Sequence, residues 1–203
     1  MHTTYLEYFG QRAEQRAQTK ALLLRASIEV FGEFGYAAAT VGQIAERAGT
    51  SRPTFYTHFD GKAAVAVQLV HELGVHFDRV FTELFELVPL TRNGVREWVV
   101  DAIRLWDPME PLPTIVDQAT VLEPVVRQLR DAQMGASIRA TAEFLKRHRT
   151  DLADDDALLH ACRLISAFHV IRQTRLLDLS PLAAITVESL TDDWWKVLGS
   201  RMR

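Results

Sequence analysis

Residues 40–62 read TVGQIAERAGTSRPTFYTHFDGK, and this stretch predicts two short helices separated by a break at Gly49. Thr40 is a favourable N-cap, because its hydroxyl can accept backbone N–H groups that the first turn leaves unpaired. Apolar residues then recur at helical spacing on one face, at Val41, Ile44, Ala45 and Ala48. We expect this helix to stop at Gly49, since glycine readily takes the left-handed conformation that ends a helix.

A second helix is predicted from Arg52 to Phe59. Ser51 can cap it, and Pro53 lies in its first turn, where a missing backbone N–H costs nothing. Phe55 and Phe59, four residues apart, form the side that we expect to be buried. The other side is polar. Two helices joined by a short turn containing glycine form the helix-turn-helix, whose second helix enters the DNA major groove.

The polar side chains of the second helix suit DNA recognition. Arg52 can pair with guanine O6 and N7, Thr54 can offer a hydroxyl or a methyl group to a base edge, and Tyr56 can reach a phosphate. Lys62 opens the following helix, where its charge and the free N–H groups of the helix start suit a second phosphate. The alternative is that these are surface residues of an ordinary helix pair.

The run from about residue 19 to 67 resembles the DNA-binding domain of the TetR family, the tetracycline-repressor-like regulators of bacteria. The match is carried by Phe31, Phe34, Gly35, Tyr36, Thr40, Val41, Ile44, Ala45, Ala48, Gly49, Ser51, Thr54, Phe55, Tyr56, His58, Phe59 and Lys62. The resemblance implies that phosphates are held by Thr40, Tyr56 and Lys62. It implies that bases face Arg52, Thr54 and His58, with Ser51 and Pro53 completing the DNA-binding set.

The chain departs from the usual family pattern at several positions: Thr50, Pro53, the pair Gly42-Gln43, and the run Gly61-Lys62-Ala63. Thr50 stands where Val or Ile is usual, and acidic residues are common at the Gly42-Gln43 pair. These departures bear on the operator sequence rather than on DNA binding itself. The SRPTFY run at 51–56 and the tryptophan placement favour the subgroup that resembles the ethionamide-resistance regulator, with an elongated pocket for hydrophobic amphiphiles.

The rest of the chain keeps helical spacing nearly to its end. We expect one long helix of roughly 27 residues from Lys62 towards Pro89, followed by helices over 93–106, 114–120, 123–148, from the acidic group at 151–156 to about 179, and from 180 onwards. No strand pattern or repeat interrupts them. The sequence predicts an all-α protein of about nine helices. Residues 1–66 would hold an N-terminal arm and the three-helix DNA-binding domain, and residues 67–203 a helical ligand-binding and dimerisation domain.

Large or adaptable apolar side chains recur in the predicted C-terminal domain and could line a pocket with few polar groups. They are Phe81, Trp98, Trp106, Met109, Met134, Phe168 and Trp194. Taken singly, each is more simply explained as an ordinary core residue. The family resemblance implies a pocket, because members of the family bind an inducer in this domain.

The last two predicted helices are apolar on more than one face, and such a surface indicates a partner. The resemblance implies a homodimer formed through these two helices. The dimer would place its two reading helices about 34–36 Å apart, which matches a palindromic operator. No cofactor is expected.

Composition and charge agree with this interpretation. The net charge of −3 divides into +1 for residues 1–62 and −4 for the remainder, so DNA affinity depends on where individual Lys and Arg lie. No apolar run spans a bilayer and no leader pattern opens the chain, which predicts a cytoplasmic protein. Cys162 lies in an apolar helical pattern and is expected to be a buried, inert thiol rather than a redox sensor.

Three other classes compete with a regulator. An acidic group, Asp151, Asp154, Asp155 and Asp156, could form a metal site with His160, but such residues more simply cap a helix and oppose its dipole. An enzyme would need a nucleophile with a base, a metal set or a phosphate-cradling loop, and none of these motifs is present. A helical partner-binding protein without specific DNA binding is the closest rival, and DNA preference at matched salt separates the two.

Overall fold

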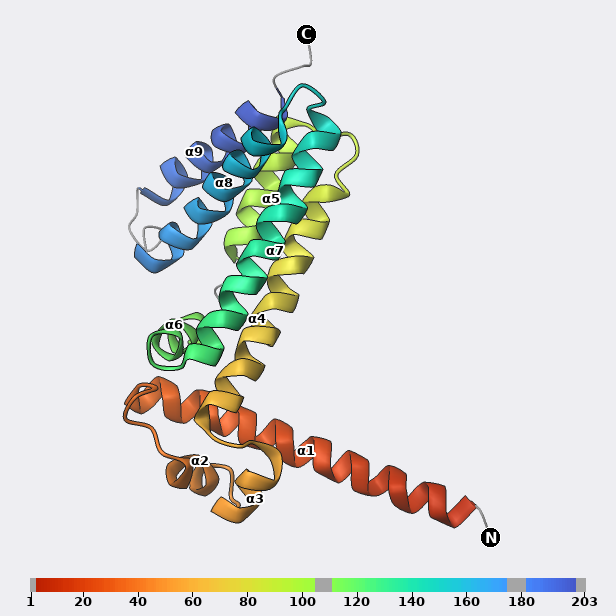
Figure 1. Cartoon of the computed structure of the whole chain (residues 1–203), viewed down its shortest axis with the longest axis vertical. Coiled ribbons are helices and arrows are strands. Elements are labelled where there is room, and N and C mark those ends of the chain that lie inside the picture. Colours follow the sequence, from red (N-terminus) through yellow and green to blue (C-terminus); the bar gives the residue numbers. More distant parts are fainter. Residues whose placement is uncertain (1–2, 105–110, 175–181, 200–203) are drawn as a thin grey trace. The chain divides into compact units, whose positions relative to one another are not determined.

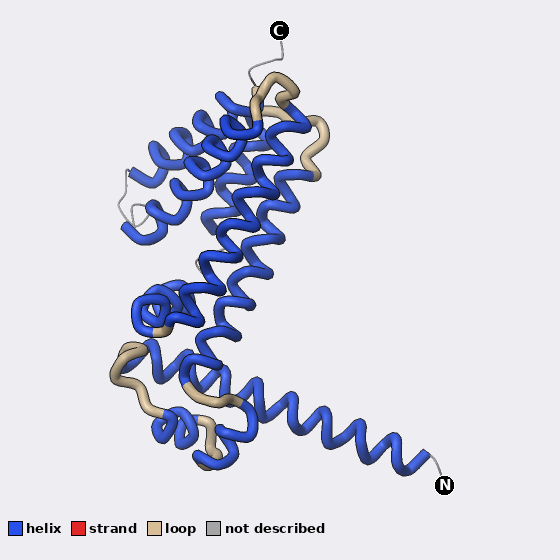
Figure 2. Tube along the Cα trace, in the orientation of Figure 1, coloured by secondary structure: helices blue, strands red, loops and turns tan. Residues whose placement is uncertain are grey.

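The computed structural model describes residues 3–104, 111–174 and 182–199, and within these ranges it contains nine helices and no strand (Figure 2). The predicted all-α fold is confirmed. By their contacts, the residues form two compact units, one of residues 1–73 and 110–130 and the other of residues 74–109 and 131–203. The predicted boundary between residues 66 and 67 divides the chain by sequence rather than by contacts, and it stays a prediction.

The first unit contains α1 (Thr3–Phe34), α2 (Val41–Arg47), α3 (Arg52–His58) and α6 (Leu112–Leu122), together with the first turns of α4 (Lys62–Phe85) and α7 (Pro124–His148) (Figure 1). α1 begins at Thr3, so the N-terminal segment is part of this helix. It ends at Gly35, which has φ +78° and donates its N–H to Phe31 O at 2.9 Å. Local chemistry therefore ends this helix.

Apolar side chains from α1, α2, α3, α4 and α6 share one core in this unit. Phe31, Ile44 and Phe55 are almost fully buried, and so are Ile115 and Ala119 of α6. α6 also accepts a hydrogen bond from the backbone, because Tyr36 N–H donates to Gln118 Oε1 at 2.8 Å. The core of the helix-turn-helix is thus completed by a helix that follows it by more than fifty residues.

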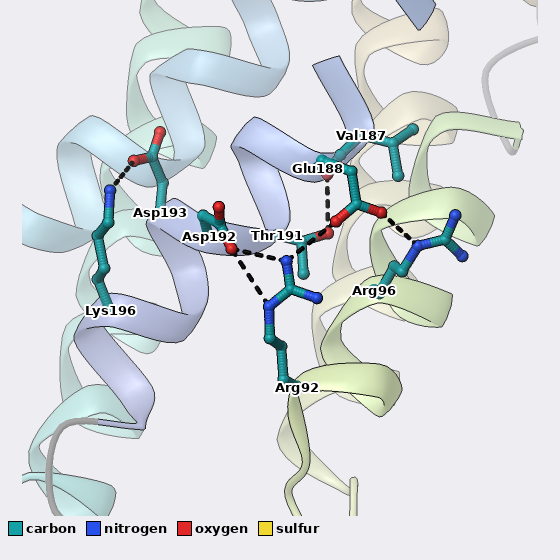
Figure 3. A network of polar contacts seen from close by, with 8 residues as sticks. All are labelled: Arg92, Arg96, Val187, Glu188, Thr191, Asp192, Asp193 and Lys196. Carbon is teal, nitrogen blue, oxygen red and sulfur yellow. Dashed lines mark hydrogen bonds and ion pairs between the residues drawn. The ribbon is translucent and has the colours of Figure 1, made fainter. Parts of the chain in front are cut away.

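The second unit contains α5 (Arg92–Arg104), α8 (Asp154–Thr174) and α9 (Leu182–Leu198) and the later turns of α4 and α7 (Figure 1). Its core is aromatic, with Trp98 of α5 and Trp194 of α9 both buried. Outside the core, α5 and α9 are joined by ion pairs (Figure 3): Arg96 Nε lies 2.6 Å from Glu188 Oε1, and Arg92 Nη2 lies 2.9 Å from Glu188 Oε2. Arg92 Nη2 is also 2.7 Å from Asp192 Oδ1.

The orientation of α8 differs from the prediction. Its core side consists of Ala157, Ala161, Leu164, Ile165 and Phe168, which recur at helical spacing. Leu158 and Leu159 are exposed, and so is Cys162, which was expected to be buried. The prediction of a buried Cys162 is therefore wrong. α8 carries apolar residues on two sides, and periodicity does not say which side meets the rest of the chain.

Candidate functional site

α2 and α3 are held in place by local caps. Thr40 Oγ1 accepts the N–H of Gln43 at 3.3 Å, and Gln43 Oε1 accepts the N–H of Thr40 at 2.8 Å, which completes a capping box at the start of α2. Gly49 has φ +64° in the turn that follows. Ser51 Oγ accepts the N–H of Thr54 at 3.3 Å and so caps α3, with Pro53 in its first turn. The predicted helix-turn-helix is confirmed in both helices and in the turn.

One side of α3 is buried and the other is open. Phe55 is fully buried and Phe59, just past the helix end, is 4% exposed. On the other side Arg52, Pro53 and Tyr56 are exposed, and Tyr56 keeps 56% of its surface accessible. A phenol ring left open to this extent is free to meet a partner. This is the division between a packing face and a reading face that DNA recognition requires.

The remaining predicted residues of α3 have structural contacts of their own. The hydroxyls of Ser51 and Thr54 are 2.8 Å apart, so both belong to the N-terminal cap of the helix. His58 is half-buried, and burial is the main cause that lowers its pKa, followed by the positive charges of Arg16 and Lys20. A lowered pKa keeps the imidazole neutral at pH 7. His58 would therefore meet DNA as a hydrogen-bonding group rather than as a cation.

Lys62 differs from the prediction in what it contacts. Its ammonium donates to three backbone carbonyls, Tyr36 O at 2.8 Å, Ala37 O at 3.2 Å and Ala39 O at 2.7 Å. It also lies 5.0 Å from the centre of the Tyr36 ring. An ammonium has three N–H donors, so all of them are engaged in fixing the loop between α1 and α2. A phosphate contact by Lys62 stays a prediction, and it would have to replace one of these bonds.

Arg52 lies across α2 rather than pointing freely into solvent. The position that a Cβ on Gly42 would occupy is 2.9 Å from Arg52 Nε and 3.0 Å from its Cζ. The guanidinium therefore rests on the α-carbon of Gly42, on the exposed side of the helix pair.

Four of the seven predicted ligand residues meet in the core of the second unit. Trp98 and Trp194 are 4.9 Å apart between ring centres, and Phe81 and Phe168 lie 5.7 and 5.4 Å from Trp98. Met134 is half-buried and packs against the same cluster. Trp106 and Met109 lie outside the described residues. Sequence periodicity therefore located most of the cluster.

The space beside these rings is small. A cavity of about 10 Å³ is lined by Phe77, Val80, Phe81, Ala102 and Phe168. That volume holds about one water molecule, so this cavity between described residues does not accommodate a larger ligand as it stands. Phe77, Val80 and Ala102 were missed by the sequence prediction, because they are small or ordinary core residues that no motif distinguishes.

One buried donor in the cluster lacks a partner. Trp194 is fully buried and its Nε1–H has no hydrogen-bond acceptor, whereas Trp98 Nε1 donates to Val80 O at 2.7 Å. An unsatisfied buried donor is costly. The asymmetry between the two indoles shows where an acceptor atom would be most favourable.

Two of the four acidic residues at the start of α8 are engaged with cations of the chain. Asp154 Oδ1 lies 2.6 Å from Lys146 Nζ, and Asp151 Oδ1 lies 2.8 Å from Arg149 Nε. No group of three or more His, Cys, Asp or Glu able to hold a metal ion occurs among the described residues. In the described part of the chain, no helix has the length and apolar character needed to cross a membrane.

Comparisons with known proteins agree with this geometry. Residues 23–69 match the family model described as bacterial regulatory proteins, tetR family. Over 83 residues the chain is 49% identical to the HTH-type transcriptional activator FasR of Mycolicibacterium smegmatis. The matched region covers 41% of this chain and 35% of FasR. Over 80 residues it is 34% identical to the regulator TtgR of Pseudomonas putida, and this matched region covers 38% of each of the two chains. The chain thus spans little more than a third of the length of these relatives.

Solved structures share the whole fold. A transcriptional regulator from Pseudomonas aeruginosa PAO1 superposes with a TM-score of 0.75 at 19% identity, covering 91% of this chain and 92% of that one. A TetR-family regulator from Mesorhizobium loti gives a TM-score of 0.69 at 17% identity, covering 91% and 96%.

The capped, half-open helix pair is a helix-turn-helix, the motif by which many regulators bind DNA. The matches to regulators are more specific: residues 23–69 match the TetR family of bacterial regulatory proteins, and solved TetR-family structures share the fold. The family consists of transcriptional regulators rather than enzymes. Assignment to the ethionamide-resistance subgroup stays a prediction.

Proposed function

We propose that the protein is a homodimeric, ligand-responsive repressor that binds a palindromic operator. The observation that carries the proposal is the open face of α3, where Arg52 and Tyr56 are exposed opposite the buried Phe55. A regulator of this kind acts on the chromosome, and we therefore place it in the cytoplasm.

The contacts of the reading helix divide by chemistry. We assign base edges to Arg52, Thr54 and His58, and phosphates to Thr40 and Tyr56. Ser51 and Pro53 shape the start of α3 close to the DNA. Lys62 contributes its charge while its ammonium fixes the loop after α1.

Exposed apolar residues of α8 and α9 support the dimer. Leu159 is 60% exposed, Val170 51% and Ile185 61%. Large aliphatic side chains gathered on two neighbouring helices favour burial against another surface. A second copy of the chain would cover them and set two reading helices about one DNA turn apart.

The effector proposed here is a small hydrophobic molecule that carries a hydrogen-bond acceptor. The aromatic cluster supplies apolar contacts, and the indole N–H of Trp194 lacks an acceptor of its own. The cavity lined by Phe77, Val80, Phe81, Ala102 and Phe168 holds about one water molecule, so a ligand that binds there must move the rings apart. That displacement of α4, α5, α8 or α9 is what would change the spacing of the reading helices.

DNA selection tests the proposal. The purified protein is used to select binding sites from a random-sequence library, and the selected sites are compared with scrambled DNA at matched salt. We expect a palindrome that is bound in preference by roughly a thousandfold or more. Equal binding to all DNA would instead describe a helical protein that binds another partner.

The thermodynamic linkage between effector binding and operator binding tests the response to ligand. If the effector releases the operator, operator DNA must weaken effector binding by the same factor. Affinity for a screened hydrophobic ligand is measured with and without the selected operator. Equal affinities would reject induction and leave DNA binding untouched.

Activation is the second candidate for the direction of regulation. FasR, with 49% identity over the matched region, is described as a transcriptional activator. Transcription in vitro from a promoter carrying the selected operator distinguishes the two, because a repressor lowers and an activator raises the transcript level.

A further inference from the structure

Gly42 lies in α2, and its backbone conformation does not require a glycine. Positive φ values occur at Gly35, Gly49 and Gly61, whereas Gly42 is an ordinary residue in the first turn of α2. Glycine inside a helix weakens it relative to alanine, because the chain loses more freedom on folding. The position therefore calls for another explanation.

The close approach of Arg52 explains why position 42 is a glycine. A Cβ at position 42 would lie 2.9 Å from Nε of Arg52, closer than side-chain carbons approach such atoms, and 3.0 Å from Cζ, which is an unusually tight contact. The guanidinium occupies the space that any other residue would fill with its side chain. An alanine would force it to move, and because Arg52 is long and exposed the move would cost little stability.

The position of this guanidinium matters for recognition, which rests on the proposed function. Arg52 is the first residue of α3, so its side chain leaves the helix at the end that meets base edges. A bidentate contact to guanine needs the planar guanidinium at a defined angle. A guanidinium that lies against α2 reaches the DNA from a different direction than one that a side chain at position 42 has pushed outwards.

We propose that Gly42 is a specificity-determining residue, whose missing side chain lets the Arg52 guanidinium lie against α2 and so sets the direction from which Arg52 meets the DNA. Gly42 itself need not touch a base. It acts through Arg52 as a positioning residue.

The test is a double-mutant cycle read by binding-site selection. Wild type, G42A, R52A and G42A/R52A are each used to select from the same random library at one salt concentration. We expect R52A to lower the preference for the best base at its position by roughly 5- to 150-fold. G42A should lower the preference at the same position by about 3- to 10-fold, and should change nothing further in the R52A background.

Two controls separate this role from a structural one. G135A adds a methyl group at another helical glycine, where the new Cβ would lie 3.3 Å from Arg139 Nη1, and it should leave the selected sequence unchanged. The unfolding temperature of G42A should equal or exceed that of the wild type, because alanine favours the helix.

Three results would overturn the inference. G42A could select the wild-type sequence, G42A could change base preference equally with and without Arg52, or R52A could leave all base preferences intact. In each of these cases the proposed function still holds, provided that the wild type selects an operator. A wild type that selects no sequence would reject the proposed function and this inference with it.

Discussion

Two buried tryptophans of the second unit differ in one hydrogen bond. Trp98 Nε1 donates to Val80 O at 2.7 Å, and Trp194 Nε1 has no acceptor. Both rings pack in the same cluster, 4.9 Å apart. The indole N–H of Trp98 therefore stabilises the core, whereas that of Trp194 is buried without compensation.

Replacing each tryptophan by phenylalanine separates these contributions. Both W98F and W194F lose ring volume, but only W98F also breaks a hydrogen bond. We expect W98F to lower the free energy of unfolding by about 1–2 kcal/mol more than W194F. Denaturant unfolding of the two variants measures the difference, and equal destabilisation would show that the two N–H groups are equivalent.

Lys62 shows why a residue that matches a motif can have a second role. Its three acceptors lie 26, 25 and 23 residues earlier in the chain, in the loop that joins α1 to α2. Motif reasoning assigns a lysine at a helix start to phosphate, and has no access to carbonyls that only folding brings there. The distances in the structure were needed to find the anchoring role.

The variant K62M keeps the length of the side chain and removes the ammonium. We expect it to lower the free energy of unfolding by about 1.5–3 kcal/mol, because three carbonyls lose a charged donor. K20M is the matched control, since Lys20 is exposed and lies 5.5 Å from the Phe59 ring, and its loss should cost under about 1 kcal/mol. A K62M protein as stable as K20M would contradict the anchoring role.

The same variant tests the phosphate contact. If Lys62 also holds a phosphate, the salt dependence of DNA binding by folded K62M falls by about one charge. An unchanged slope would limit Lys62 to the loop.

At the scale of elements, the helix ends and the faces of α2 and α3 could be predicted, whereas the buried face of α8 could not. Thr40, Ser51 and Gly49 act within three or four residues of themselves, so their signals are present in the local sequence. The exposed side of α8, with Cys162 on it, depends on which partner covers the helix. The same limit applies to α6, whose burial against α1 no pattern indicated.

The ion pairs between α5 and α9 make stability depend on pH. Arg96 and Arg92 lower the pKa of Glu188 below its ordinary value of 4.5. A carboxyl with a lowered folded pKa stabilises the protein above pH 4.5, and this contribution is lost as the pH falls through the folded pKa. The stabilising contribution of these ion pairs is lost only at acid pH, and neutral or alkaline conditions leave the pairs intact.

The variant E188Q removes this dependence. We expect E188Q to be less stable than wild type at pH 7, with the difference disappearing in acid and shrinking in concentrated salt, because all the partners are exposed. E97Q is the control, since Glu97 accepts a hydrogen bond from Asn93 Nδ2 at 2.9 Å rather than from an arginine. Urea unfolding at several pH values measures the stability difference between wild type and E188Q, and parallel pH profiles for the two proteins would refute the prediction.

At the scale of the molecule, the proposed dimer depends on the exposed aliphatic residues of α8 and α9. The double variant L159K/I185K places charges on side chains that are 60% and 61% exposed, so folding should be unaffected. We expect it to be a monomer by light scattering and to lose operator affinity by about tenfold or more, because phosphate contacts are halved.

V75K serves as the control for this variant. Val75 is 67% exposed on α4, away from both helices in sequence, and its replacement should leave the protein dimeric. A dimeric L159K/I185K protein would place the interface elsewhere.

The central claim is that α3 reads DNA sequence. The most direct measurement is the ratio of the affinities for selected operator and scrambled DNA at one salt concentration, made for wild type and for R52A. We predict a ratio of roughly a thousand or more for wild type, reduced by about 5- to 150-fold in R52A. A wild-type ratio near one, unchanged in R52A, would contradict the account.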